Sequence, residues 1–288
     1  MIPQRDTKIN KLKYGLYVVS TPIGNLDDIS SRAIDAFKNS DLILCEDTRV
    51  TRSLISKLDI SECKNSEFIS FNDHSADKIP FIIEKIKSSR FPVLVSDAGS
   101  PVISDPAYPL LKACLEREIE IDTCPGVSSV TVALELSGLP STPYSFHGFL
   151  PRSKGDVLKA LKSHESLGHT HVYFESPHRI ISTLEIIKSH LPLSDIAICR
   201  ELTKKFQSVY RSKAKDLNLE DIQVKGEFVL CLYHPHALMS SSNASGSELQ
   251  GLANKYLNKS STKNLSKLLS LVLDRNAKEI YDELIKAR

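Results

Sequence analysis

The chain has 288 residues, which is long for one ordinary domain and leaves room for two. Its 41% hydrophobic and 25% charged residues are typical of globular proteins, and a net charge of +2 does not by itself indicate a nucleic-acid partner. No apolar run approaches the roughly 18 residues of a membrane span. Residues 1–15 lack the apolar centre of a signal peptide, so we expect a cytoplasmic protein with no membrane segment.

Strands and amphipathic helices alternate through the first half of the chain. Apolar strand-like segments occupy 15–20, 41–45, 92–96 and 119–124. Apolar residues recur at helical spacing in the segments between them, and a last helix is expected to end at Gly138. This alternation predicts a mostly parallel sheet with helices on both faces.

The alternation of strands and helices is interrupted at the Pro- and Gly-rich segment "PSTPYSFHGFLPRSKGD". Strand-like segments then occupy 170–175, 195–200, 207–212 and 227–233, and some follow each other without a long helix, which predicts a second, mixed sheet. A Ser-rich segment at 240–247 resembles a linker, and two short amphipathic helices follow it. We therefore predict two α/β domains, 1–140 and 141–238, and a linker with a helical tail, 239–288.

Cysteine and histidine spacing gives little indication of metal binding. The six cysteines form no C-x-x-C pair, which is typical of reduced, buried thiols. Histidines gather at His164, His169 and His171 and at His234 and His236, but without cysteine or carboxylate neighbours at a recognisable ligand spacing. We expect no metal site.

Unusual loops follow three of the first-half strands. They read "STPIGN", "SDAGSPVISDP" and "CPGVSS", and each combines Gly or Pro with Ser, Thr or Asp. Ligands bind outside the carboxyl ends of parallel strands, which is where these loops should lie. Neither G-x-G-x-x-G nor the G-x-x-x-x-G-K-[ST] phosphate loop is present, so a zwitterionic nucleoside suits these loops better than a pyrophosphate.

Motifs in a fixed order carry a family resemblance. "LYVVSTPIGNLDDIS", "CEDTRVTRSLI", "SDAGSPVISDPAY", "PGVSSVTVALELSGLP", "HGFLPR", "YFESPHR" and "RELTK" resemble the ribosomal small-subunit methyltransferase I family of the tetrapyrrole methylase superfamily. The chain departs from that family at "FNDH", usually Tyr-His-Glu-His, at "SPVIS", usually Thr-Pro-Gly-Ile-Ser, and at Val127, usually Pro. The resemblance implies a homodimer that binds S-adenosylmethionine between two α/β domains. It also implies methylation of a cytidine ribose 2′-hydroxyl in the decoding region of 16S rRNA.

The resemblance makes residues 97–105 the main cofactor loop, with one wall from the loop at 125–129. The far wall comes from the second domain, from "VYFE" at 172–175, "CRELT" near 200–203 and "GEFVL" after Gly226. The implied cofactor contacts are Pro22, Gly24, Asp97, Ala98, Gly99, Pro101, Val102, Ser104, Asp105, Pro125, Gly126, Ser128, Ser129, Tyr173, Glu175 and Glu201. An ordinary position in the sheet core is the alternative for Tyr173.

A base would help a ribose hydroxyl to attack the methyl group. Asp47, beside Arg49 as a phosphate clamp, is the first candidate, and Glu46 and His74 are the others. An ordinary hydrogen-bonded loop histidine is the alternative for His74. A carboxylate at a helix start that pairs with Arg49 or Arg52 is the alternative for Asp47. The expected contacts to 16S rRNA, within a structured small ribosomal subunit, are Arg49, Arg52, Arg152, Arg179 and Lys204. Arg179 could instead pair with Glu175.

Rival functions are methylation of a corrin or porphyrin precursor and RNA binding without catalysis. The basic helical tail counts against the first, and the intact cofactor loops count against the second.

Overall fold

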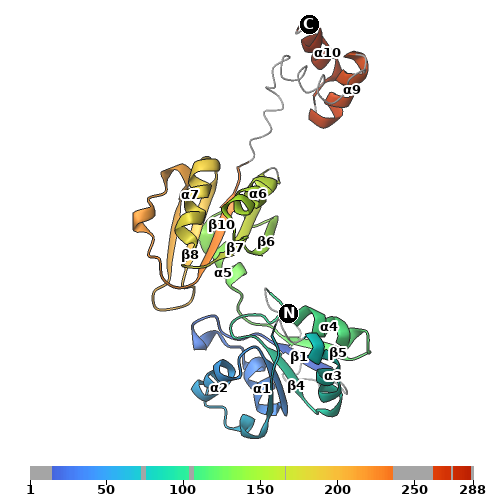
Figure 1. The fold of residues 1–288 in the computed structure, drawn as a ribbon, viewed down its shortest axis with the longest axis vertical. Coiled ribbons are helices and arrows are strands. Elements are labelled where there is room, and N and C mark those ends of the chain that lie inside the picture. The colour runs from blue at the N-terminus through green and yellow to red at the C-terminus, as the bar shows by residue number, and fades with distance from the viewer. Residues whose placement is uncertain are drawn as a thin grey trace, which may run out of the picture. The chain divides into compact units, whose positions relative to one another are not determined.

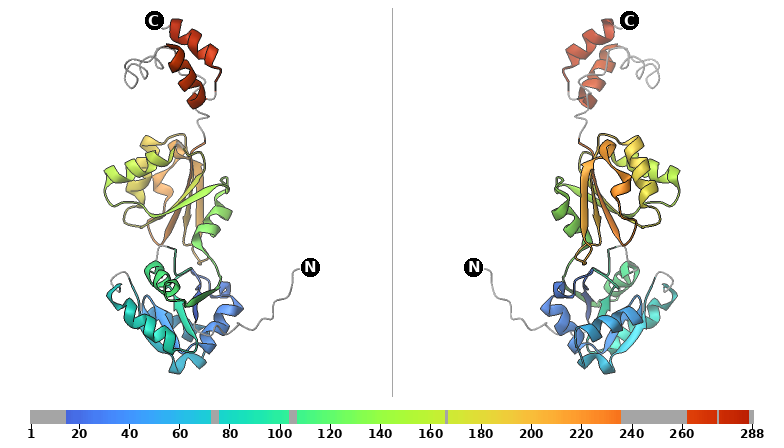
Figure 2. Two further views of the ribbon diagram at one scale, coloured as in Figure 1. Left: turned by 90° about the vertical axis from the view of Figure 1, so that its right-hand side faces the viewer. Right: turned by 90° about the vertical axis from the view of Figure 1, so that its left-hand side faces the viewer.

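The computed structural model describes residues 15–72, 76–103, 107–165, 167–235, 262–273 and 275–286. The chain divides into two compact units, of which the larger holds two β-sheets and the smaller holds helices α9 and α10 (Figures 1 and 2). Most of the predicted linker lies outside the described residues. None of the described helices is both long and apolar enough to cross a membrane.

The first sheet is parallel and has the order β3-β2-β4-β1-β5. Its strands are β1 (Gly15–Val19), β2 (Leu42–Cys45), β3 (Glu67–Ser70), β4 (Pro92–Val95) and β5 (Glu120–Cys124). Successive side chains of β1, β2 and β4 point to opposite faces, and both faces are buried. Helices α1 (Ser31–Asn39) and α2 (Thr48–Lys57) cover one face, and α3 (Ile79–Ser88) and α4 (Ala107–Leu115) cover the other. The predicted parallel sheet with helices on both faces is confirmed.

The second sheet is mixed and has the order β6-β7-β10-β8-β9, with one parallel pair, β6 and β7. Its strands are β6 (Tyr144–Phe149), β7 (Thr170–Glu175), β8 (Asp195–Arg200), β9 (Ser208–Lys213) and β10 (Phe228–Tyr233). Helices α6 (Lys154–Glu165) and α7 (Ile180–His190) cover one face. The predicted mixed sheet is confirmed, and edge strand β6 is an addition that the sequence analysis lacked.

Helix α5 (Ser129–Ser137) links the two sheets. It packs on the other face of the second sheet through Val130, Ala133 and Leu134. It ends at Gly138, whose φ of 71° lies in the left-handed region, as expected for a helix C-terminus. A helix that precedes residue 140 therefore covers the second sheet, while the proposed division into three parts stays a prediction.

The smaller unit contains two helices, α9 (Thr262–Leu273) and α10 (Ala277–Lys286). Leu265, Ile280 and Leu284 are buried, and Arg275 pairs with Glu283 at 2.6 Å between Nη2 and Oε1. These contacts join the two helices to each other, as the amphipathic pattern predicts.

Candidate active site

The loops after β1 and β4 are joined to each other at the carboxyl edge of the first sheet. The backbone N–H of Thr21 donates to the carbonyl of Gly99 (2.9 Å), and the N–H of Gly99 donates to the carbonyl of Thr21 (3.1 Å). The Ser96 hydroxyl also donates to the Gly99 carbonyl, at 3.2 Å. These bonds fix the shape of the loop at its sharpest point.

Gly99 has a φ of +78°, in the left-handed region that residues with a Cβ atom rarely adopt. An added Cβ would also lie 3.3 Å from Cγ2 of Ile23. The sequence therefore requires glycine here for the backbone turn itself, and the loop shape depends on it.

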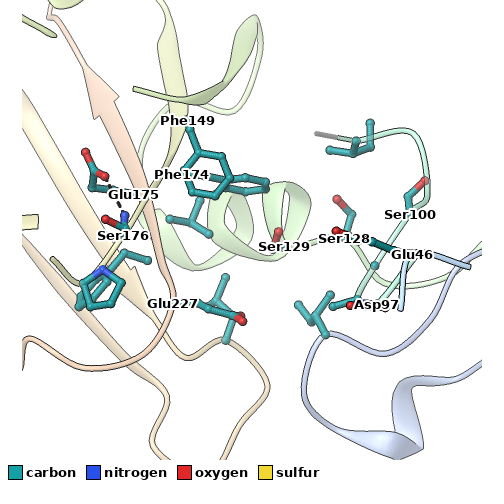
Figure 3. A pocket seen from close by; sticks show the side chains of 18 residues that line it. Glu46, Asp97, Ser100, Ser128, Ser129, Phe149, Phe174, Glu175, Ser176 and Glu227 are labelled. Carbon is teal, nitrogen blue, oxygen red and sulfur yellow. Dashed lines mark hydrogen bonds between the residues drawn. The ribbon is translucent and has the colours of Figure 1, made fainter. Parts of the chain in front are cut away.

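A cavity of about 490 Å³ lies beside this loop, between residues of the two sheets (Figure 3). Figure 3 shows Asp97, Ser100 and Ser128 on one side and Phe149, Phe174 and Glu175 on the other. The lining residues are Ile23, Glu46, Asp97, Ala98, Gly99, Ser100, Ile103, Ser128, Ser129, Phe149, Phe174, Glu175, Ser176, Pro177, Leu202, Glu227, Phe228 and Val229. The cavity is therefore polar at its ends and apolar between them.

The charge of this lining is one-sided. Glu46, Asp97, Glu175 and Glu227 are among the lining residues, which include no lysine, arginine or histidine in the described part of the chain. Glu175 is paired with Arg179 and Glu227 with Lys204, so the charge is carried mainly by Glu46 and Asp97. Partial burial is the main cause that raises the pKa of Asp97, whose Oδ1 accepts a hydrogen bond from the backbone N–H of Asp47 at 3.1 Å. Such a lining suits a cationic or zwitterionic ligand and opposes a phosphate group.

A second, more open cavity of about 600 Å³ adjoins the first. Both are lined by Ile23, Asp97, Ala98 and Glu227. The open cavity is also lined by Pro22, Gly24, Leu26, Asp47, Arg49, Val50, Ser53, Leu54, Lys57 and Lys204. Cations therefore lie around the open cavity, and carboxylates lie at the boundary between the two.

Asp47 is the N-terminal cap of α2 and accepts a hydrogen bond from the backbone N–H of Arg49 at 2.8 Å. Its Oδ2 also lies 2.6 Å from Nη2 of Arg49, whose side chain is 88% exposed. Hydrogen bonds from Arg49 lower the pKa of the Asp47 carboxyl group to about 2. A carboxylate with so low a pKa is a weak proton acceptor, which favours the helix-start alternative over the general base.

We expect Asp47→Asn to change the rate of methyl transfer by less than about tenfold, because asparagine caps helices as well as aspartate does. The rate at saturating substrate, measured across pH, checks this. A lost general base would instead slow transfer by about 100-fold or more.

Because the pKa of Asp47 is lowered from 3.8 to about 2, its ion pair stabilises the folded state above pH 4, and this contribution disappears as the pH falls toward 2.

Glu175 and Arg179 form an ion pair, called the latch below, that joins the segment after β7 to the segment after β6. The Glu175 side chain is fully buried, and its Oε1 lies 2.7 Å from Nη2 of Arg179. Nη1 of Arg179 donates to the carbonyls of Leu150 (3.0 Å) and Pro151 (2.8 Å). The guanidinium of Arg179 therefore binds groups of the protein itself. This agrees with the alternative in which Arg179 pairs with Glu175 and does not contact RNA.

The predicted site residues fall into separate groups. Those on the closed cavity are Asp97, Ala98, Gly99, Ser128, Ser129 and Glu175, and those on the open cavity include Pro22, Gly24, Asp47, Arg49 and Lys204. Pro101 lies in a small hollow behind the loop, with Phe71 and Ala107. Ser104, Asp105 and His74 lie outside the described residues.

The other predicted residues line neither cavity. Val102, Pro125 and Gly126 belong to the flanking loops, and Glu201 pairs with Lys204 at 3.0 Å. Arg52 lies over the ring of Phe68, at 3.8 Å from its centroid, and Arg152 is exposed. Tyr173 is 1% exposed in the core that faces α6 and α7, where its hydroxyl lies 2.8 Å from Nδ1 of His164. Its side chain therefore does not line the cavity, while that of its neighbour Phe174 does.

The rings of Phe149 and Phe174 form an aromatic wall of this cavity, of which only Phe174 lies in a segment that the resemblance assigns to the site. Phe149 is 60% exposed in the cavity, and its ring packs edge to face with Phe174 at 5.5 Å between centroids. Ser176 was not predicted either, whereas Leu202 and Glu227 lie in the segments "CRELT" and "GEFVL" that the resemblance assigns to the far wall. In the sequence, the position of Phe149 next to a glycine is a weak indication of an irregular strand. It does not reveal that the ring lines a cavity.

Solved structures share this fold. A diphthine synthase aligns with a TM-score of 0.59 at 15% identity, over 76% of this chain and 89% of that one. The uroporphyrin-III C-methyl transferase of Thermus thermophilus, solved with S-adenyl homocysteine, aligns with a TM-score of 0.52 at 14% identity, over 76% and 97%. Likeness at these identities shows the fold alone.

Residues 15–218 match the family model described as Tetrapyrrole (Corrin/Porphyrin) Methylases, so the chain is a member of this class. The chain is 38% identical to the "Ribosomal RNA small subunit methyltransferase I" of Rickettsia prowazekii, over 96% of this chain and 98% of the relative. It is 42% identical to the protein of the same name in Thermotoga maritima, over 70% and 89%. The chain therefore belongs to the ribosomal RNA small subunit methyltransferase I family.

Proposed function

We propose that this protein transfers the methyl group of S-adenosylmethionine to the ribose 2′-hydroxyl of a cytidine in the decoding region of 16S rRNA. The observation that carries the proposal is the pair of adjoining cavities. One is the more enclosed, and its described titratable lining residues are all acidic, whereas the lining of the more open one also holds the cations Arg49, Lys57 and Lys204. The first suits a cationic cofactor without phosphate, and the second suits a polyanion. We further propose that the protein acts as a cytoplasmic homodimer, as the sequence resemblance implies.

The closed cavity fits S-adenosylmethionine chemically. The N-terminus of α5 at Ser128 and Ser129 suits the methionine carboxylate, since helix N-termini favour anions. The Asp97 carboxylate suits a positive group of the same ligand, and the rings of Phe149 and Phe174 suit the adenine. When bound, the cofactor supplies an electrophilic methyl group.

The chain's own contribution to the reaction is to orient the nucleophile and to accept its proton. Holding the attacking oxygen near 3 Å from the methyl carbon, in line with the bond that breaks, supplies much of the acceleration. Asp97 and Glu227 border both cavities, so a hydroxyl that enters from the open side meets them first. Asp97 is a better proton acceptor than Asp47, because burial raises the pKa of Asp97 while Arg49 lowers that of Asp47.

The aromatic wall gives a direct test of the cofactor site. We expect Phe149→Ala to weaken binding of S-adenosylmethionine about tenfold, the scale of a lost ring contact. The free energy of unfolding should change by less than about 1 kcal/mol, because the ring is 60% exposed. Calorimetric titration and chemical denaturation measure the two quantities. Phe81→Ala, at a 55% exposed ring on α3, is the matched control and should bind as wild type does.

The function itself is tested by mapping 2′-O-methylation of 16S rRNA from cells with and without the gene. Loss of one modified cytidine in the decoding region, restored by the wild-type protein but not by Asp97→Asn, supports the proposal. An unchanged methylation map together with methylation of a corrin or porphyrin precursor in vitro would support the rival function. The 38% and 42% identities to proteins named for ribosomal RNA favour the first outcome.

A further inference from the structure

A group of histidines lies on the side of the second sheet that faces α6. His147 belongs to β6, His164 to α6 and His171 to β7. Nε2 of His147 lies 3.0 Å from Nδ1 of His171, and the rings of His147 and His164 stack with their centroids 3.9 Å apart. One ring nitrogen from each of the three histidines lies within 4.8 Å of the others. Three separate elements thus bring imidazoles together.

Alternation along β6 directs His147, which follows Phe146, into this group, and a β-bulge then turns Phe149 to the opposite face of the sheet. Phe146 pairs with Val172, and Phe149 pairs with Phe174, so His147 and Gly148 together stand opposite Tyr173. Gly148 has a φ of +67°, which permits the extra residue. A shift of one residue moves later side chains to the other face of a sheet. His147 therefore faces α6, whereas Phe149, two residues later, lines the cavity on the opposite face.

We propose that His147, His164 and His171 form a binding site for a divalent transition metal ion of the zinc type, with its fourth position open. Imidazole nitrogens bind zinc at about 2.0–2.1 Å, so two ligands of a tetrahedral ion lie about 3.3 Å apart. The 3.0 Å between His147 and His171 is close to that spacing. The expectation of no metal site rested on ligand spacing along the sequence, and it did not include His147.

For the three nitrogens to converge on one ion, the His164 ring has to turn, because it is stacked on that of His147 at an interplanar angle of 20°. The rings of His147 and His171, whose facing nitrogens lie 3.0 Å apart, have to tilt toward the same point. His164 lies in the last turn of α6 and is partly exposed, which leaves it room to turn. The Tyr173 hydroxyl, 2.8 Å from Nδ1 of His164, is the outer contact that orients this ring.

The ion would clamp edge strand β6 to β7 and α6. Because Phe149 follows His147 on the same strand and lines the cavity, the clamp would also fix the aromatic wall. The histidines line neither cavity, so the ion would act on structure and not on the transferred group. This inference does not depend on the proposed function.

The test uses the full chain without a histidine tag, freed of metal and titrated with Zn²⁺ by calorimetry and with Co²⁺ by visible absorption. We expect one ion per chain, an increase in the melting temperature with Zn²⁺, and a tetrahedral Co²⁺ spectrum. His147→Gln and His164→Ala should each weaken binding about 100-fold or more, whereas His190→Ala, at an exposed position on α7, should bind as wild type does.

A measurement on the wild type alone guards against variants that fail to fold. Zn²⁺ should protect the partly exposed His147 and His164 from modification by diethylpyrocarbonate, as mapped by mass spectrometry, while the exposed His178 and His190 should react equally with and without the ion. Sub-stoichiometric binding, equal binding by the cluster variants and the control, or protection at histidines outside this group of three would overturn the proposal.

Discussion

Asp97→Asn is expected to raise the dissociation constant of S-adenosylmethionine by about 10- to 100-fold. Hydrogen bonds to charged groups contribute about 1.5–3 kcal/mol, and each 1.4 kcal/mol is tenfold in affinity. Asparagine keeps an oxygen that can accept the hydrogen bond from the backbone N–H of Asp47, so the loop should keep its shape. A weaker affinity would therefore be due to the lost charge of Asp97. Calorimetric titration of the folded variant measures this affinity.

Asp122→Asn provides the comparison, because this partly exposed aspartate of β5 lines neither cavity. Its affinity should match the wild type. Titration with S-adenosylhomocysteine, which lacks the sulfonium charge, separates the two positive groups of the cofactor. A loss confined to S-adenosylmethionine would place the sulfonium near Asp97, and an equal loss for both ligands would place the ammonium there. Unchanged affinity for both would remove Asp97 from the cofactor site.

Arg179→Met is expected to lower the free energy of unfolding by about 3 kcal/mol, since removing one partner leaves the buried Glu175 carboxylate uncompensated. For a unit of this size the melting temperature should fall by roughly 6–12 °C. The variant also frees the carbonyls of Leu150 and Pro151, and so loosens the segment that follows Phe149. Chemical denaturation measures the effect on stability, and cofactor titration measures the effect on the cavity.

Arg152→Met is the comparison for Arg179→Met, because it replaces an arginine that is predicted to contact RNA and not to stabilise the fold. Arg152 is exposed near the same latch, and the structure shows no ion pair for it among the described residues. Its replacement should change the stability by less than about 0.5 kcal/mol. If Arg152 contacts RNA phosphate, binding should weaken and the salt dependence should become shallower. Equal stability of the Arg179 and Arg152 variants would contradict the role given to the latch.

The sequence determined the two sheets and the position of the main loops. The central strands of the first sheet, β1, β2 and β4, are short apolar runs followed by turn residues, and burial on both faces requires such a run. The edge strand β3 is only partly buried and was not predicted. The turn at Gly99 was also visible, because its combination of Gly, Pro and Asp constrains the backbone locally. Properties that depend on neighbours along the chain could thus be predicted from the chain alone.

Only the tertiary structure decided which side chains meet. Strand β6 was missed because its glycine and its half-exposed residues hide the strand pattern, and the bulge that follows turns Phe149 to the cavity. The environments of Asp47 and Arg179 likewise depend on exact partners, which lower the pKa of the first and commit the guanidinium of the second. The meeting of His147, His164 and His171 requires strand register and helix placement together. Contacts between segments that are distant in the chain depend on how the helices and strands pack. Local sequence patterns do not directly encode this packing.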